Sequence, residues 1–404
     1  MKPLSARNAA WAAAFVTAGT AAALAPMIGG DTPVSAPAIG QAGERKLPAP
    51  PTNGVMGFVI DSFVPPIVPG MEQCGGSTSP KVRDAYLLSL PEAERARLSR
   101  KENEPELTRL WHASVVGANG TNLCSQPDMF ERPVLRTIQT GTGWGLDLDD
   151  GQGANGAETG GHEVFSSTAG ERGIDNQEYR ALGCKLEFRG PDGNGGDQLV
   201  GMRQFFASGE WTQVILLRGV DSLENDPEVE VIYANTPDRP MADSKGKFLP
   251  GSSFTISDTP PRNRNVLRGK IENGVLTTSA HDIVLTQTWG QGGARDIRGN
   301  RTKWNFLRGK LRLTFQPDGS LQGLVGGYRP VFDPIQSPAI GGIGSPLTAG
   351  IDCAAELATL RKLADGLRNP KTGKCEGVST AMRVSAIPAF VNDVPQPRQR
   401  SAAR

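Results

Sequence analysis

The sequence predicts a mainly β protein: an antiparallel β-sandwich of the concanavalin or jelly-roll kind, with a short helical N-terminal segment and a C-terminal helix. Its 50 glycines and 31 prolines, among 404 residues, favour turns and short strands over long helices. Apolar and polar residues alternate with period two at 229–233, 283–286 and 311–316, as in a sheet with one buried face. Asn273-Gly274 and Asp318-Gly319 predict tight hairpin turns between such runs.

The chain begins with a predicted export signal at residues 1–25. Lys2 and Arg7 precede an uncharged, alanine-rich run, and Ala23-Leu24-Ala25 offers small residues for cleavage. Because the run is short for a membrane span, cleavage is favoured over an uncleaved anchor. No stable membrane span is expected after cleavage, and the protein is expected in the periplasm or outside the cell.

The remaining pattern divides the chain into five segments. They are a Pro/Gly/Ala-rich linker at 26–56, a helical N-terminal segment at 57–133, the β-sandwich at 134–340, a C-terminal helix with a disulfide-tied segment at 341–392, and a disordered tail at 393–404. Acidic residues after Pro91 and Asn103 predict two short helices there. Apolar residues at helical spacing predict a helix from about Cys353 to Leu367.

The balance of charge limits the class of partner. The chain carries 43 Lys and Arg against 42 Asp and Glu, a formal net charge of +1. No global field therefore draws it to nucleic acid or to anionic lipid. The expected partner is an unknown envelope component or a carbohydrate.

Five cysteines in an exported chain are candidates for disulfides, and none lies in a C-x-x-C motif. We predict a Cys74–Cys124 bond around the helix-prone segment, which leaves Cys184 free. A second bond, Cys353–Cys375, would tie the C-terminal helix to the residues after it, because eight nearly extended residues can retrace about 21 Å of helix. The alternative is that this second pair stays as two free thiols.

An acidic loop is the candidate metal site. Asp147, Asp149 and Asp150 lie close together, and Asp175-Asn176 could add further oxygen ligands. The spacing does not make an EF-hand, but carboxylate and carbonyl oxygens suit Ca²⁺. The sequence therefore predicts a calcium site, with a solvated acidic turn as the alternative.

Three carboxylates, Asp149, Glu163 and Asp175, are the candidates for acid–base catalysis, with His162 beside Glu163. A glycoside hydrolase needs two carboxyl groups facing each other across a sugar. A G-x-G-x-x-G match at 151–156 is not followed by the helix that dinucleotide binding requires. No G-x-S-x-G, H-E-x-x-H or P-loop motif occurs.

Four tryptophans lie in the predicted β region: Trp144, Trp211, Trp289 and Trp304. Exposed tryptophans would stack on sugar rings, whereas buried ones would fill the core.

Several short stretches of the sequence carry a resemblance to a known family. They are YLLSL and ERARLSR between 86 and 100, GANGTNLC at 117–124, GIDNQEYRALGC at 173–184, and residues 365–375 up to PKTGKC. Together they resemble an uncharacterised family of exported proteobacterial proteins, over roughly residues 70 to 390. The resemblance implies export but no activity. It also implies a cysteine in relatives just before the position of His162, which would leave Cys184 without that partner here.

These observations favour an exported binding protein of the cell envelope or periplasm, with carbohydrate as one candidate ligand. The alternative is a glycoside hydrolase or lyase that uses carboxylates on the β-sandwich. A structural envelope protein is the second alternative.

Overall fold

The protein is described by a computed structural model that covers residues 46–117, 120–150, 165–167, 170–199, 201–202, 211–256, 264–286, 303–336 and 344–393. All of these residues belong to the same unit of the chain. The predicted export signal, the linker up to residue 45 and the tail from residue 394 lie outside them.

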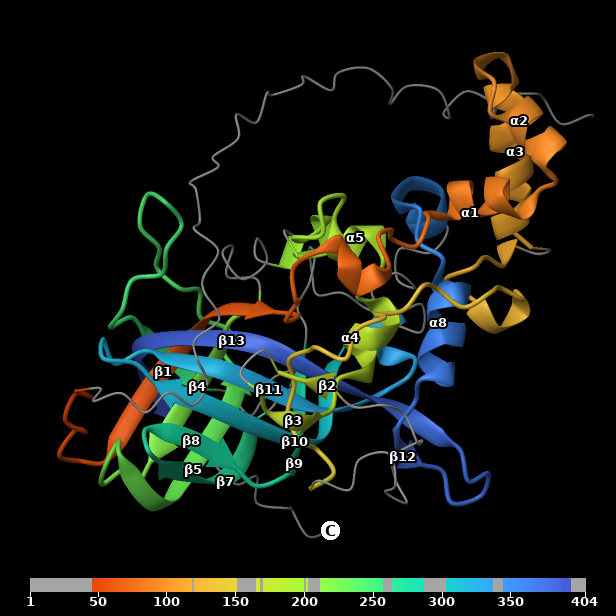
Figure 1. The fold of residues 1–404 in the computed structure, drawn as a ribbon. Coiled ribbons are helices and arrows are strands. Elements are labelled where there is room, and N and C mark those ends of the chain that lie inside the picture. Colours follow the sequence, from red (N-terminus) through yellow and green to blue (C-terminus); the bar gives the residue numbers. More distant parts are fainter. Residues whose placement is uncertain are drawn as a thin grey trace, which may run out of the picture. The chain divides into compact units, whose positions relative to one another are not determined.

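Eight strands form a closed antiparallel barrel (Figure 1). Each strand pairs with the next barrel strand along the chain, and the last, β13, returns to pair with the first, β1. The barrel strands are β1 (Val55–Val64), β4 (Gln213–Arg218), β5 (Asn225–Asn235), β7 (Arg264–Glu272), β8 (Val275–Thr278), β10 (Lys303–Phe315), β11 (Leu321–Pro330) and β13 (Cys375–Asp393).

The predicted β-sandwich is therefore wrong, although the protein is mainly β. Both architectures bury one face of each strand, so period-two alternation cannot separate them. The strands that close the barrel, β1 and β13, also lie in the two segments predicted around helices, at 57–133 and 341–392.

A bulge in β10 shows how the sheet curves. The pairing register between β10 and β11 shifts between Leu307 and Lys310, and Arg308 adopts a left-handed φ of 52°. A Cβ placed on Gly327 would lie 2.9 Å from the Cα of Gly309, so both positions need glycine. Bulges and glycines of this kind bend strands into barrels.

Apolar side chains from all eight strands fill the barrel interior. They include Phe58, Ile215, Val231, Leu267, Leu276, Leu313, Val325 and Val384, each no more than 2% exposed. The alternating runs predicted at 229–233 and 311–316 are confirmed as strands, and so are the hairpin turns at Asn273-Gly274 and Asp318-Gly319. An eight-stranded barrel is just wide enough for its side chains to fill the interior.

Among the described residues, five further strands lie outside the ring. β6 (Ser253–Ile256) pairs with the end of β13, β9 (His281–Thr286) with β10, and β12 (Gly366–Arg368) with the start of β13. β2 (Phe165–Ser166) and β3 (Arg172–Ile174) form a separate hairpin. Phe248, Phe254 and Ile256 cover the outer face of β1, β4 and β5, which explains why β4 is buried on both faces.

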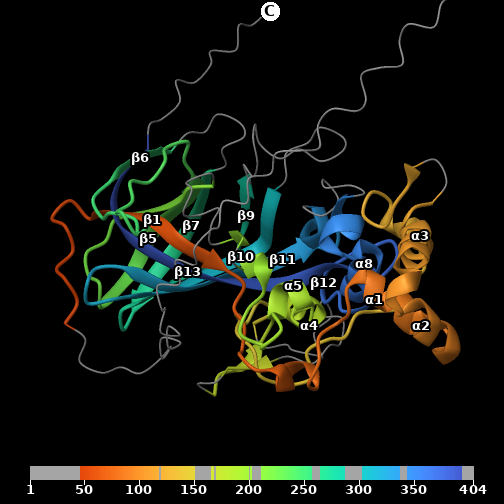
Figure 2. The same ribbon diagram turned by 90° about the horizontal axis from the view of Figure 1, so that it is seen from above.

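The helices lie to one side of the barrel (Figures 1 and 2). They are α1 (Val82–Ser89), α2 (Glu92–Leu98), α3 (Glu104–Val115), α4 (Gln177–Leu182), α5 (Leu186–Arg189) and α8 (Cys353–Lys362), with short turns η1 (Met71–Cys74), η2 (Lys101–Asn103), η4 (Pro127–Met129), η6 (Asp333–Ile335) and η7 (Ser345–Ala349). The two helix starts predicted after Pro91 and Asn103 are confirmed. Within the described ranges, every helix falls short of the length and hydropathy needed to cross a bilayer.

Two disulfides are present, but the predicted pairing is wrong. Cys74 pairs with Cys184, and Cys124 pairs with Cys353. Cys375 lies outside both bonds. The predicted helix to Leu367 ends at Lys362, because residues 366–368 form a strand that pairs with β13, and Cys375 lies opposite Arg368 in that hairpin.

The Cys74–Cys184 bond closes a loop of 110 residues, and Cys124–Cys353 closes one of 229. Replacing both cysteines of either pair with serine is expected to lower the free energy of unfolding by about 2–5 kcal/mol, whereas Cys375→Ser leaves it nearly unchanged. Denaturant unfolding measures the change. Peptide mapping of the unreduced protein should find these two cross-linked peptides, and a Cys74–Cys124 peptide would contradict the assignment.

Candidate functional site

A cavity of about 650 Å³ lies between the barrel and the helices. It opens at the barrel end where β1 and β11 finish and β10 and β13 begin, because Pro65, Trp304, Arg329 and Thr380 line it. The opposite walls come from α4, α5, α8, η6 and η7. Its volume is within the range of sites that bind small molecules.

The floor of the cavity is apolar. Met202, Trp304 and Met382 line it and also pack on the barrel core. Below them, the rings of Phe63 and Trp211 lie 5.4 and 5.6 Å from the ring of Trp304, so aromatic side chains separate the cavity from the barrel interior. Phe188 and Leu182 extend the apolar lining onto the helical side.

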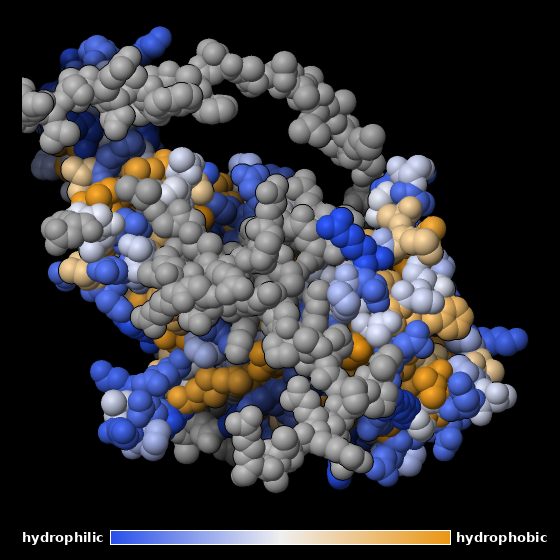
Figure 3. Space-filling model, turned by 180° about the vertical axis from the view of Figure 1, so that it is seen from behind, coloured by the Kyte–Doolittle hydropathy of each residue, from blue (hydrophilic) through white to orange (hydrophobic). Residues whose placement is uncertain are grey.

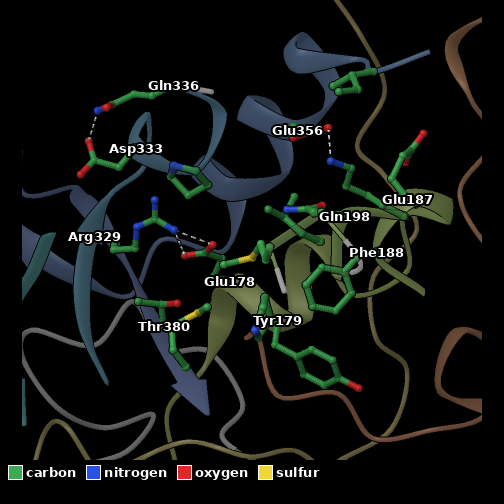
Figure 4. A pocket seen from close by; sticks show the side chains of 18 of the residues that line it. Glu178, Tyr179, Glu187, Phe188, Gln198, Arg329, Asp333, Gln336, Glu356 and Thr380 are labelled. Atoms are coloured by element: carbon green, nitrogen blue, oxygen red, sulfur yellow. Dashed lines mark hydrogen bonds and ion pairs between the residues drawn. The ribbon is translucent and has the colours of Figure 1, made fainter. Parts of the chain in front are cut away.

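Two ion pairs link the walls of the cavity (Figure 4). Nη1 of Arg329, on β11, donates to both carboxylate oxygens of Glu178, on α4, at 2.8 and 3.0 Å. The guanidinium of Arg329 also lies 4.2 Å from the centre of the Trp304 ring. Nζ of Lys185 lies 2.5 Å from Oε1 of Glu356, on α8. These charge-assisted contacts link the barrel to α4, and the N-terminus of α5 to α8.

The local sequence explains how Glu178 reaches this position. Asn176 caps α4, because its side-chain oxygen accepts a hydrogen bond from the Tyr179 amide at 3.2 Å. Its side-chain nitrogen donates to the Trp144 carbonyl at 2.7 Å. The cap anchors the first turn of α4, and Glu178 in that turn faces Arg329.

Asp333 is a buried cavity carboxylate, and its hydrogen-bond partners among the described residues are neutral. It is 8% exposed and accepts hydrogen bonds from the side-chain amides of Asn305, at 2.5 Å, and Gln336, at 2.6 Å. Burial raises the pKa of Asp333 above its usual value, and the positive charge of nearby Arg329 acts against that rise. Burial likewise raises the pKa of Glu356, against the opposing charge of Lys185.

A second feature, on the outer face of the barrel, brings together three of the predicted metal ligands. One carboxylate oxygen of each of Asp147, Asp149 and Asp175 lies within 4.8 Å of the others. The backbone nitrogen of Asp175 donates to the Leu146 carbonyl, and Asp175 Oδ2 accepts from the Leu148 amide at 2.8 Å. These three carboxylates could hold a divalent cation, because Ca²⁺ takes several oxygen ligands at 2.3–2.6 Å.

The other predicted ligands have different partners. Asp150 pairs with Nζ of Lys310 at 2.8 Å, and Asn176 is used as the α4 cap. Of the candidate catalytic carboxylates, Asp149 and Asp175 belong to the acidic cluster, whereas Glu163 and His162 lie outside the described residues. Asp175 is only 2% exposed, which suits an enclosed cation better than contact with a sugar.

Burial and neighbouring charges set the protonation of this cluster. Burial, together with the charges of Asp149, Asp365 and Asp147, raises the pKa of Asp175 to about 7. Burial also raises the pKa of Asp365, which lies in the same electrostatic neighbourhood, to about 6. A bound cation would relieve this repulsion.

The described tryptophans offer no open platform for a sugar. Trp144 and Trp211 are buried, Trp304 lies under Arg329, and Trp289 lies outside the described residues. On the face drawn in Figure 3, hydrophilic and hydrophobic residues are mixed over the described surface.

No model of a known protein family, no curated protein and no solved structure matches this chain. The resemblance to exported proteobacterial proteins therefore stays a prediction.

Apart from Asn176, which was predicted as a metal ligand, and Trp304, which was considered for sugar stacking, the described residues that line the cavity were not among those predicted for a site. Arg329 and Glu356 could have been noticed in the sequence, because each is a charged residue on an otherwise apolar face of its strand or helix. Nothing in the sequence around Asp333 indicates that it is buried, since its burial depends on how η6 packs on the barrel.

The acidic cluster predicts a response to both pH and calcium. With chelator present, the raised pKa of Asp175 means that the folded state binds more protons than the unfolded chain between about pH 4 and pH 7. Stability should therefore fall as pH rises through this window, by up to about 1.4 kcal/mol per pH unit for one proton. Thermal melts should show this loss, and Asp175→Asn should reduce it.

At pH 8, adding calcium should raise the wild-type melting temperature above its value with chelator. A ligand at a hundredfold excess over its Kd adds about 2.7 kcal/mol to the free energy of unfolding. The variant Asp150→Asn should keep the calcium response, because Asp150 pairs with Lys310, whereas Asp175→Asn should lose it. Identical wild-type melts with calcium and with chelator would rule out this site.

Proposed function

We propose that this protein is an exported binding protein that holds a small molecule with an apolar body in the cavity between one end of its barrel and the helices. The observation that carries the proposal is a partly open cavity of about 650 Å³ with an apolar floor and two ion-paired walls. Small-molecule sites are typically concave, mostly apolar and equipped with a few polar groups that orient the ligand. Closed eight-stranded barrels are one of the scaffolds that bind single small ligands.

The partners of the cavity carboxylates favour binding over hydrolysis. Glu178 accepts from Arg329, Glu356 pairs with Lys185, and Asp333 accepts from two side-chain amides. A general acid or base must lie within hydrogen-bond reach of the proton that it gives to or takes from the substrate. These carboxylates are instead engaged in contacts that hold the walls together.

Export is supported by the disulfides. Two disulfides, Cys74–Cys184 and Cys124–Cys353, are compatible with an oxidising compartment, where such bonds persist. Cys184 lies between α4 and α5, and Cys353 begins α8, so each bond supports a wall of the cavity. A periplasmic or extracellular location fits a ligand that is an envelope component.

Filling the cavity tests the proposal. A Cβ on Gly201, which lines the cavity, would meet no heavy atom within 4 Å, and its backbone is not strained. Gly201→Trp should place a large side chain in this space and lower the affinity for N-phenyl-1-naphthylamine, a neutral apolar dye, by about tenfold or more. Fluorescence titration measures the affinity.

Gly141→Trp is the matched control, because Gly141 is exposed, lies outside the cavity lining and is equally uncrowded. It should bind the dye as the wild type does. Equal affinities for wild type and Gly201→Trp, or no saturable binding by the wild type, would contradict the proposed function.

A further inference from the structure

The charges that line the cavity are not balanced. Among the described lining residues, the cations are Lys81, Lys185 and Arg329, whereas the acids are Glu178, Glu187, Asp197, Asp333 and Glu356. Arg329 is paired with Glu178, and Lys185 with Glu356. Lys81 lies 4.0 Å from Glu187, at the limit of an ion pair. Asp197 is exposed at the rim.

Asp333 is a buried lining carboxylate that has no ion pair among the described residues. It is more than nine-tenths buried, and the described partners of its two oxygens are neutral amides, one on each oxygen. Each oxygen of a carboxylate can accept more than one hydrogen bond. A buried carboxylate without a cation is costly, so a cation that enters beside Asp333 would gain both a hydrogen bond and charge compensation.

The surroundings of Asp333 suit a cation attached to an apolar body. Figure 4 shows Asp333 and Arg329 on one side of the cavity, with Phe188 and Tyr179 across it. Trp304 already has the guanidinium of Arg329 over its ring, which shows that this lining accommodates a positive group next to aromatic carbon. An anionic ligand would instead meet Glu178 and Asp333 on the same wall.

We propose that the ligand is an organic cation, such as a protonated amine on an apolar chain, and that Asp333 is the residue that selects its charge. This proposal rests on the proposed function, because it assumes that the cavity is the binding site. It adds the chemical class of the ligand.

Three probes of equal chain length and different charge test the proposal: octylammonium, octanol and octanoate, each titrated calorimetrically into the full chain at pH 7.5. Octylammonium should bind about tenfold or more tightly than octanoate, with octanol between them. Asp333→Asn should lower the affinity for octylammonium by about tenfold and leave that for octanol unchanged. Asp197→Asn, which removes an exposed lining charge, should preserve the wild-type order.

The outcomes separate the two proposals. If all three probes bind equally, or octanoate binds best, the choice of a cation is wrong while apolar binding stands. If none of the probes binds, both proposals fall. If Asp333→Asn does not fold, the order of the three affinities for the wild-type protein still decides whether the cavity prefers a cation.

Discussion

The pairing of β13 with β1 is the constraint on which the rest of the structure depends. It joins the last described strand to the first and turns an open meander into a closed barrel. The 19 residues of β13 also pair with β11, β12 and β6. Closure removes the sheet edges of the ring, which would otherwise expose unpaired backbone groups. It also fixes the end of the barrel at which the cavity forms.

The cavity exists because a long insertion, between β1 and β4, folds back over this end. Aromatic side chains fill this end of the barrel, so the cavity lies beside the barrel core and not within it. The insertion contains α4 and α5. The ion pair Arg329–Glu178 joins α4 to the barrel, and the ion pair Lys185–Glu356 joins the start of α5 to α8. Such ion pairs add little net stability, but these two hold the cavity walls in position. The disulfides end at Cys184, between α4 and α5, and at Cys353, at the start of α8, so they restrain the same walls.

The sequence predicted local structure well, because local structure depends on residues near one another in the chain. The alternation at 229–233 and 311–316, the Asn-Gly and Asp-Gly turns, and the acidic starts of α2 and α3 were all readable. The acidic cluster was predicted in part: Asp147, Asp149 and Asp175 meet, because Gly145 lets the chain approach the Asp175 carbonyl, where a Cβ would lie 2.4 Å away. Asp150 and Asn176 found other partners, which their spacing could not reveal.

The features that the sequence did not predict depend on contacts between residues far apart in the chain. Closure requires β1 to find β13 across more than 300 positions of sequence, and alternation says nothing of which strands are neighbours. The disulfides join Cys74 to Cys184 and Cys124 to Cys353, whereas proximity in sequence favoured Cys353–Cys375. The cavity is likewise made of residues from many elements, none of which forms a motif.

A crystal structure of the protein soaked with 1-bromooctane would test the closed barrel and the apolar cavity together. The expected result is a continuous β1–β13 ladder and one anomalous bromine peak in contact with Trp304 or Met382. An open sheet at β1, or bromine bound only on the outer surface, would contradict it.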